Sequence, residues 1–347
     1  MKKRTLSAMD LSLLCHQMEL VFKSGVSPLE GIPILSEDIS NPEIKKSMMF
    51  ISEKMINGML MHQAFSEEGS FPDYMLHMIK IGELTGMLDT VMENLSVYYE
   101  KESDLRKDIK NAITYPVILA LLMLGVIGLI ILKVIPMFGE IVENLGGQMP
   151  IEAQALFSFT VSLERIFLWS ILIVVPVTLA IIIYFNTPKG SFVFDRLKVK
   201  NSITGLLYRK ILAYRVGQGL SMTTQSGMNI MDSFNAVKGL IENKYVTKRL
   251  EEASVKITSG ESFSDTIRDT DVFPELFSRM IKTAERSGKL EGIMQKLSRV
   301  YGKEVEVSLK NFSKTVEPTL VAILSVVLGI VLLSVLLPLI GMMSSIG

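Results

Sequence analysis

The chain contains an internal repeat, because a shift of 202 positions places its first third on its last third without a gap. A period of this length indicates duplicated domains and excludes a short-repeat solenoid. Each copy ends in a long apolar run, so the repeated unit combines a soluble module with a membrane anchor. The matching positions are Gly25 and Gly227, Gly58 and Gly260, Phe71-Pro72 and Phe273-Pro274, Glu83 and Glu285, Gly86 and Gly288, Tyr99 and Tyr301, Pro116 and Pro318, and Pro136 and Pro338.

Composition agrees with a membrane protein that has large aqueous parts. Hydrophobic residues make up 48% of the 347 residues, and charged residues still make up 21%. Apolar and charged residues must therefore be segregated along the chain. The single cysteine, Cys15, excludes an internal disulfide and suits modules in a reducing cytoplasm. Charged and polar residues from position 10 onward interrupt any signal-peptide core, so no cleaved leader is predicted.

Three stretches reach the roughly 20 apolar residues that are needed to cross a bilayer, and they predict transmembrane helices at 116–137, 166–185 and 318–341. The first and third are repeat equivalents, while the second has no counterpart. They contain no Asp, Glu, Arg or His, and Lys133 lies close to an end. Because transporters normally carry buried polar groups at mid-membrane, these spans argue against transport by this chain alone.

Lysine and arginine predict the topology, since cytoplasmic flanks carry the positive excess. Basic residues precede the first span and follow the second, whereas the loop 138–165 holds four glutamates and one arginine. We therefore expect two cytoplasmic modules, 1–115 and 186–317, with the N-terminus in the cytoplasm. The loop and the tail 342–347 are expected outside, so the C-terminus is extracytoplasmic. The unpaired second span returns the chain to the cytoplasm for the second module.

Both modules are predicted to be all-α, as helical bundles of about six helices each, because apolar residues recur at helical spacing. Ser27 is a candidate N-cap before Pro28, and Glu30 is placed to complete a capping box. The last helix of the first module is expected to be the longest and to run from about residue 88 toward the membrane. Further helix starts are predicted at Asn41-Pro42 and Phe71-Pro72, and helix ends at Gly25, Gly58 and Gly86.

A tyrosine–proline pair, Tyr115-Pro116, lies where that long helix meets the first span, and Glu317-Pro318 occupies the same place in the second copy. Proline inside a helix removes one backbone hydrogen bond, so a kink is predicted at each of these membrane-entry joints. Motion of a module would pass through its joint into the span.

The two modules differ in net charge. Residues 1–110 hold 12 Lys/Arg and 17 Asp/Glu, a net charge of −5, whereas residues 186–316 hold 22 and 14, a net charge of +8. Opposite charge would attract the modules to unlike partners or to each other. An equally good interpretation is that part of the positive charge holds the second module at the anionic inner leaflet.

Candidate chemistry is sparse, and the sequence predicts no enzyme, no cofactor and no metal site. The G-x-x-x-x-G-K-[ST] phosphate loop does not occur, so energy from nucleotide hydrolysis would have to come from a partner. The histidines have no companion at ligand spacing, and Cys15 and its neighbour His16 point to different helix faces. No nucleophile and base can therefore be paired.

The most distinctive local element is a glutamate three residues before a helix-ending glycine. It occurs as Glu83 with Gly86 and again as Glu285 with Gly288. Such a carboxylate can contact a facing helix terminus or a basic partner, or order the turn. A structural role is the favoured interpretation. A catalytic role is not expected, since no second titratable group accompanies the carboxylate in the sequence.

These features together resemble the type II secretion F domain family, the polytopic platform proteins of type II secretion and of type IV pilus or competence pseudopilus assembly. The resemblance covers nearly the whole chain, with Ala284 in place of an expected glycine and without the longer N-terminal extension of many members. In the first copy it rests on Ser24-Gly25-Val26-Ser27-Pro28-Leu29, Gly58, Phe71-Pro72, Gly82-Glu83-x-x-Gly86-x-Leu88 and Tyr115-Pro116. In the second copy it rests on Ser226-Gly227, Gly260-Glu261-Ser262-Phe263, Phe273-Pro274, Glu285-x-x-Gly288-x-Leu290 and Pro318.

The resemblance implies a protein of the cytoplasmic (inner) membrane that couples a hexameric assembly ATPase to the insertion of pilin-like subunits into a filament. Its expected partners are that ATPase, the pilin-like subunits, other membrane components of the machine and the lipid bilayer, with no direct contact to nucleic acid. A homo-oligomer is also expected. The alternatives are a membrane-anchored signalling scaffold and the membrane subunit of a transporter. Charge-free spans count against the transporter, and the duplicated anchor counts against a simple scaffold.

Overall fold

The computed structural model describes residues 6–134, 136, 137, 140, 169, 172, 173, 176–181, 183–201 and 204–346, and the regular secondary structure among them is helical, with no strand. This confirms the predicted all-α class. The chain divides into two compact units. The first contains residues Met1–Asp108 and Pro188–Ser308, and the second contains Ile109–Thr187 and Leu309–Gly347. The first unit holds the short helices of both modules, and the second holds the apolar segments.

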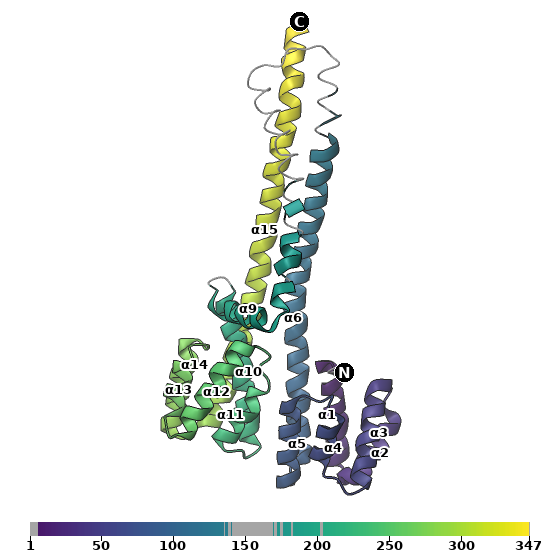
Figure 1. Cartoon of the computed structure of the whole chain (residues 1–347), viewed down its shortest axis with the longest axis vertical. Helices are drawn as coiled ribbons and strands as arrows, with labels where there is room; N and C mark the ends of the chain where they lie inside the picture. The colour runs from purple at the N-terminus through teal and green to yellow at the C-terminus, as the bar shows by residue number, and fades with distance from the viewer. Residues whose placement is uncertain are drawn as a thin grey trace. The chain divides into compact units, whose positions relative to one another are not determined.

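The first module consists of five short helices and the beginning of a long one (Figure 1). Each short helix packs against its neighbour in the chain. The described helices are α1 (Ala8–Lys23), α2 (Pro28–Asp38), α3 (Pro42–Ile56), α4 (Met61–Glu68), α5 (Asp73–Thr85) and α6 (Leu88–Leu129).

The second module repeats this plan and adds one helix before it. Helices α12 and α14 begin and end 202 residues after α3 and α5, so the repeat seen in the sequence is also a repeat of structure. The added helix, α9, has no counterpart in the first module, and the sequence analysis did not separate it from its neighbour. The described helices are α9 (Pro188–Lys200), α10 (Gly205–Gln225), α11 (Ile230–Lys238), α12 (Lys244–Thr258), α13 (Phe263–Asp269), α14 (Glu275–Ser287) and α15 (Leu290–Ile346).

The helix boundaries follow the predicted signals with one exception. Gly25, Gly58 and Gly86 all have positive φ and lie at or just after helix ends, as expected. Asn41 caps α3 through its side chain, which accepts a hydrogen bond from the amide of Glu43. The predicted capping box at Ser27 is wrong in its side-chain part. Its backbone carbonyl accepts the first helical hydrogen bonds, but the Ser27 hydroxyl makes no cap bond.

Each module has its own hydrophobic core, which large side chains fill. In the first module the aromatic rings of Phe65 and Phe71 pack together, and Tyr74 lies against Tyr98 of α6. In the second module Phe277 stacks on Phe273 and also meets Tyr301 of α15. The long helix of each copy therefore forms part of the core of its module.

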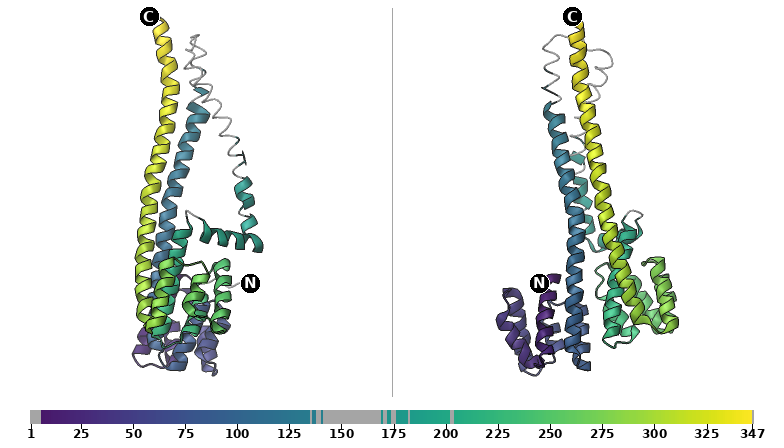
Figure 2. Two further views of the ribbon diagram at one scale, coloured as in Figure 1. Left: turned by 90° about the vertical axis from the view of Figure 1, so that its left-hand side faces the viewer. Right: turned by 180° about the vertical axis from the view of Figure 1, so that it is seen from behind.

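The long helices continue through the prolines at the predicted joints. Helix α6 contains Pro116 within its span and passes into a π-helical turn, Ile130–Val134, while α15 contains Pro318. The kink at each joint stays a prediction. Figure 2 shows α6 and α15 as long unbroken ribbons, and in the second unit Ile131 packs against Val331.

Within the described part of the chain, two helices are long and apolar enough to cross a membrane, and a bent pair of shorter helices would add a third if it is counted as one span. The two lie in α6 and α15, where the first and third spans are predicted. The predicted loop 138–165, except residue 140, falls outside the described residues, as do eight of the 20 residues of the predicted span 166–185. Helix α15 continues to Ile346, beyond the predicted end of the third span at 341.

Candidate functional site

The carboxylate of Glu83 binds the start of a neighbouring helix in the first module. It accepts hydrogen bonds from the backbone amides of Met61 at 2.7 Å and His62 at 3.2 Å, the first two residues of α4. The first amides of a helix have no partner within the helix, and they carry the positive end of its dipole. Glu83 therefore ties the end of α5 to the start of α4.

Glu285 makes the same contact in the second module. It accepts hydrogen bonds from the amides of Phe263 at 3.0 Å and Ser264 at 3.2 Å, at the start of α13, and from the hydroxyl of Ser262. Burial acts to raise the pKa of Glu285, but these hydrogen bonds outweigh it and hold the pKa below its ordinary value.

The glycine three residues after each glutamate ends its helix in the left-handed region, with φ of 74° at Gly86 and 66° at Gly288. A side chain would strain this conformation, whereas glycine adopts it freely. The turn directs the chain into α6 or α15, next to the helix terminus that the glutamate binds. The repeated element thus combines a glycine turn into the long helix with a hydrogen-bonded link between two short helices.

One premise of the sequence analysis is wrong, because a second titratable group does accompany Glu83. The Nδ1 atom of His62 lies 2.6 Å from the Glu83 carboxylate, and both side chains are about four-fifths buried. In the second module Ser264 stands at the equivalent position, so the pair is not common to both copies. Among the described residues, no cluster of His, Cys, Asp or Glu could hold a metal ion.

An ion cluster with a buried pair at its centre joins the two modules within the first unit. Glu102 of α6 is almost fully buried and accepts two hydrogen bonds from the guanidinium of Arg215 in α10, at 2.5 and 3.0 Å. Arg106 bonds the same carboxylate at 2.7 Å and also reaches Glu242 of the second module at 2.8 Å. Close by, α11 packs on α5, where a Cβ atom added to Gly239 would lie 3.3 Å from the Cβ of Asp73.

The repeat equivalent of Glu102 makes a different contact. Glu304 of α15 pairs with Lys210 of α10 at 3.1 Å, and that lysine also donates to the hydroxyl of Ser308 at 3.2 Å. The first glutamate therefore binds between modules, and the second binds within its own module. Sequence reasoning missed Arg215 and Glu102. The available signal was a charged residue, Arg215, at a position where the first copy has an apolar one.

The membrane-entry joints of the two copies meet each other in the second unit. The hydroxyl of Tyr115 donates a hydrogen bond to the carboxylate of Glu317 at 3.1 Å. These two residues are repeat equivalents, since 202 positions separate them. Pro116 and Pro318 follow them directly. The structure thus brings Tyr115 and Glu317 together, and their role as membrane-entry joints stays a prediction.

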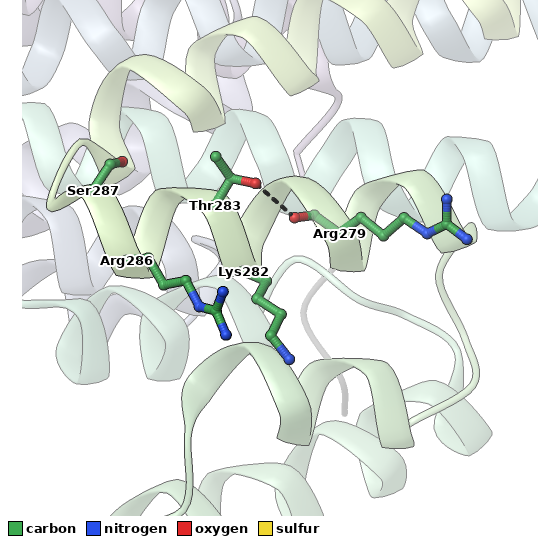
Figure 3. Close-up of a pocket in the computed structure, with 5 residues that line it drawn as sticks. All are labelled: Arg279, Lys282, Thr283, Arg286 and Ser287. Atoms are coloured by element: carbon green, nitrogen blue, oxygen red, sulfur yellow. Dashed lines mark hydrogen bonds between the residues drawn. The ribbon is translucent and has the colours of Figure 1, made fainter.

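A basic groove follows the exposed side of α14 in the second module. Figure 3 shows the side chains of Arg286 and Lys282 extending to the same side of the helix, with Arg279 one turn away. Thr283 and Ser287 complete the lining. Lys282 pairs with Asp265 at 3.3 Å, and Arg279 pairs with Glu275. This surface suits an acidic partner, and its three cations correspond to His77, Lys80 and Leu84 in the first module.

The structure thus defines a membrane protein with two homologous helical modules, each of which runs through a long helix into an apolar segment. The model of type II secretion system protein F matches residues 14–136 and 218–338, one match to each copy. Together these matches cover more than half of the chain. The chain belongs to the type II secretion system protein F family.

Curated relatives match along nearly the whole chain. A type IV pilus assembly protein PilC of Thermus thermophilus is 28% identical over 331 residues, which are 95% of this chain and 82% of the relative. A PilC of Pseudomonas aeruginosa is 25% identical and covers 98% of this chain and 91% of the relative. The type II secretion system protein F of Vibrio cholerae is 24% identical and covers 98% and 84%.

Proposed function

We propose that this chain is the membrane platform of a type II secretion or type IV pilus assembly machine, and that it couples a cytoplasmic assembly ATPase to the insertion of pilin-like subunits into a filament. The observation that carries the proposal is the continuity of the long helices. Helices α6 and α15 each begin in the core of a soluble module and continue without a break into an apolar segment. A displacement of the module is therefore transmitted to the span.

The proposal includes a topology. Both modules lie in the cytoplasm, the N-terminus is cytoplasmic and the C-terminus is extracytoplasmic. The distribution of lysine and arginine around the predicted spans supports it. A reporter fused after Gly341 should be active only outside the cytoplasm, whereas cytoplasmic activity would contradict three spans.

We assign the ATPase contact to the basic groove on α14. Three cations on one exposed helix face attract an acidic surface and raise its rate of association. The first module has only one lysine, Lys80, at the equivalent positions. The groove is therefore a property of the second module alone, which makes the contact specific for one of the two copies.

The test uses the full-length protein in detergent and the purified assembly ATPase of the same organism. The unchanged chain should bind that ATPase, and the double variant Arg279→Glu, Arg286→Glu should weaken binding by about tenfold or more. Lys256→Glu, at an exposed site on α12, is the matched control and should bind normally. Absence of binding by the unchanged chain would overturn the function. Equal binding by all variants would overturn only the assignment to α14.

A further inference from the structure

The contact between the two modules uses unlike faces. The second module contributes α10 and α11, and the first module contributes α5 and α6. An interface between unlike faces can be repeated from copy to copy, because each added copy again presents both faces. In the first module, α1 and α2 correspond to α10 and α11. In the second module, α14 and α15 correspond to α5 and α6.

The remaining face of the first module is apolar and exposed. On α1, Met9, Leu13 and Leu20 follow one helix face, and more than half of each residue is exposed. Ile34 of α2 is likewise exposed. Their equivalents in the second module are Ile211, Arg215, Met222 and Ala236, and these are buried or nearly so.

Arg215 shows that the first module lies against part of that face, because its guanidinium binds Glu102 of the first module, while α9, which has no counterpart in the first module, also packs on α10. Ile211 and Met222 lie on the same helix face as Arg215, one turn before it and two turns after it. The residues that are buried on α10 and α11 of the second module are thus the equivalents of residues that are exposed on α1 and α2 of the first module. We refer to the open stripe of Met9, Leu13, Leu20 and Ile34 as the α1 face.

On the other side of the contact, residues of α5 and α6 in the first module are buried, and their apolar equivalents on α14 and α15 of the second module are exposed. On α6 the side chains of Tyr98, Glu102 and Leu105 are buried, and on α5 Tyr74 is fully buried. Their equivalents in the second module are Val300, Glu304, Val307 and Leu276. The three apolar ones are exposed, by 36%, 48% and 49% for Val300, Val307 and Leu276. We refer to these four residues as the α15 face.

Charge favours joining the two open faces. Glu304 already pairs with Lys210 inside the second module, so its carboxylate would not be left without a partner when the face is covered. Leu13 stands in place of Arg215, so no second cation would be buried there. Burial of an unpaired charge is costly, and this arrangement avoids it. The opposite net charges of the two modules add an attraction at longer range.

We propose that the α1 face of one copy binds the α15 face of a second copy of this chain, and so repeats between molecules the contact that joins the two modules within one molecule. The proposal goes beyond the function proposed above, since it requires neither the ATPase nor a filament. It predicts head-to-tail association, in which Leu13 of one copy lies near Val300 of the next.

Cysteine cross-linking of the full-length protein in detergent tests this arrangement. One preparation carries Leu13→Cys and a second carries Val300→Cys with a different tag. Both sites are exposed, and native Cys15 is fully buried, so the unchanged chain is the negative control. A short bifunctional maleimide should join the two tags in the mixed sample and give little product in either sample alone. Reaction with a monofunctional maleimide first checks that both new thiols are accessible.

Each result decides the question. Cross-linking of the Leu13→Cys sample by itself would indicate a like-with-like contact and overturn the proposal. Failure to join the tags while both thiols react would also overturn it, and protection of the Leu13→Cys thiol only in lipid bilayers would assign the α1 face to lipid. As a second measurement, Leu13→Glu should weaken self-association by about tenfold or more in sedimentation, because it places a charge in an apolar contact. Met49→Glu, which is equally exposed on α3, should leave it unchanged.

Discussion

Glu83 and Glu285 perform the same task with different companions. Each carboxylate occupies the amides at the start of a short helix, but His62 accompanies the first and Ser262 with Ser264 the second. The task that the two copies share is therefore contact with backbone amides, which any sequence at the helix start supplies. This geometry favours a role in ordering the module, and it leaves little free capacity on either carboxylate for a partner protein.

Loss of the Glu83 carboxylate should loosen the start of α4. In Glu83→Ala the amides of Met61 and His62 lose their acceptor, and loss of such a cap costs about 1–2 kcal/mol. Hydrogen exchange of these amides should accelerate by about tenfold, which corresponds to 1.4 kcal/mol. Glu93→Ala, at an exposed site on α6, is the control. Unchanged exchange in Glu83→Ala would show that the hydrogen bonds contribute nothing.

The second module should lose stability in acid through Glu285. Its pKa in the folded protein lies below the ordinary value of 4.5, so the ionised form is favoured by folding. The contribution is complete above the unfolded pKa and is lost as the pH falls through the folded pKa. Thermal unfolding of the chain from pH 6 to about pH 3 should therefore show a decline that is smaller in Glu285→Gln. An identical decline in both proteins would contradict the role of this carboxylate.

The sequence predicted these glutamates but not all that surrounds them. Their spacing to Gly86 and Gly288 indicated a turn, because only glycine readily adopts positive φ at a helix end. The contact between His62 and Glu83 depends on how α4 and α5 pack, and residues 21 positions apart carry no local signal for it. The hydroxyl of Ser27 shows the opposite case. A strong local signal was present, yet the backbone satisfied the helix start without the side chain.

At the scale of elements, the long helices α6 and α15 connect the core of each module to the apolar segment. Sequence reasoning predicted a long last helix and a proline joint, since charge gives way to an apolar run there. It could not show whether the helix breaks at the proline, because helix propensity is overridden by packing. Helix α6 spans 42 residues and continues through Pro116.

Softening α6 between the module and the span should uncouple them. Lys107, Asp108 and Lys110 are exposed, so replacing all three by glycine removes no core packing. Each glycine costs about 1 kcal/mol of helix stability relative to alanine. We expect the glycine variant to remain in the membrane but to lose filament assembly, as measured by filament yield. The matched variant with three alanines should keep it. Normal assembly in both would show that α6 need not be stiff.

For the whole molecule, the repeat predicted two homologous modules but not how they meet. The two copies share a fold, and their contact depends on the few surface positions at which they differ. Arg215 against Leu13 is the clearest of these differences, because it supplies the cation that Glu102 binds. A single sequence shows such a difference without showing its partner, which lies 113 residues away.

The contact between the modules should depend on the buried pair of Glu102 and Arg215. In Glu102→Gln the Arg215 guanidinium is left buried without a countercharge, and breaking such a pair costs about 3 kcal/mol or more. Limited proteolysis of the full-length protein should then cut between the modules at least tenfold faster. Glu304→Gln is the matched control, since its pair with Lys210 is more exposed and is worth at most about 1 kcal/mol. Replacing both partners, as in Glu102→Leu with Arg215→Leu, should restore much of the resistance, because no charge is then left buried without a partner. If Glu102→Gln alone were as resistant as the unchanged chain, the ion pair would not hold the modules together.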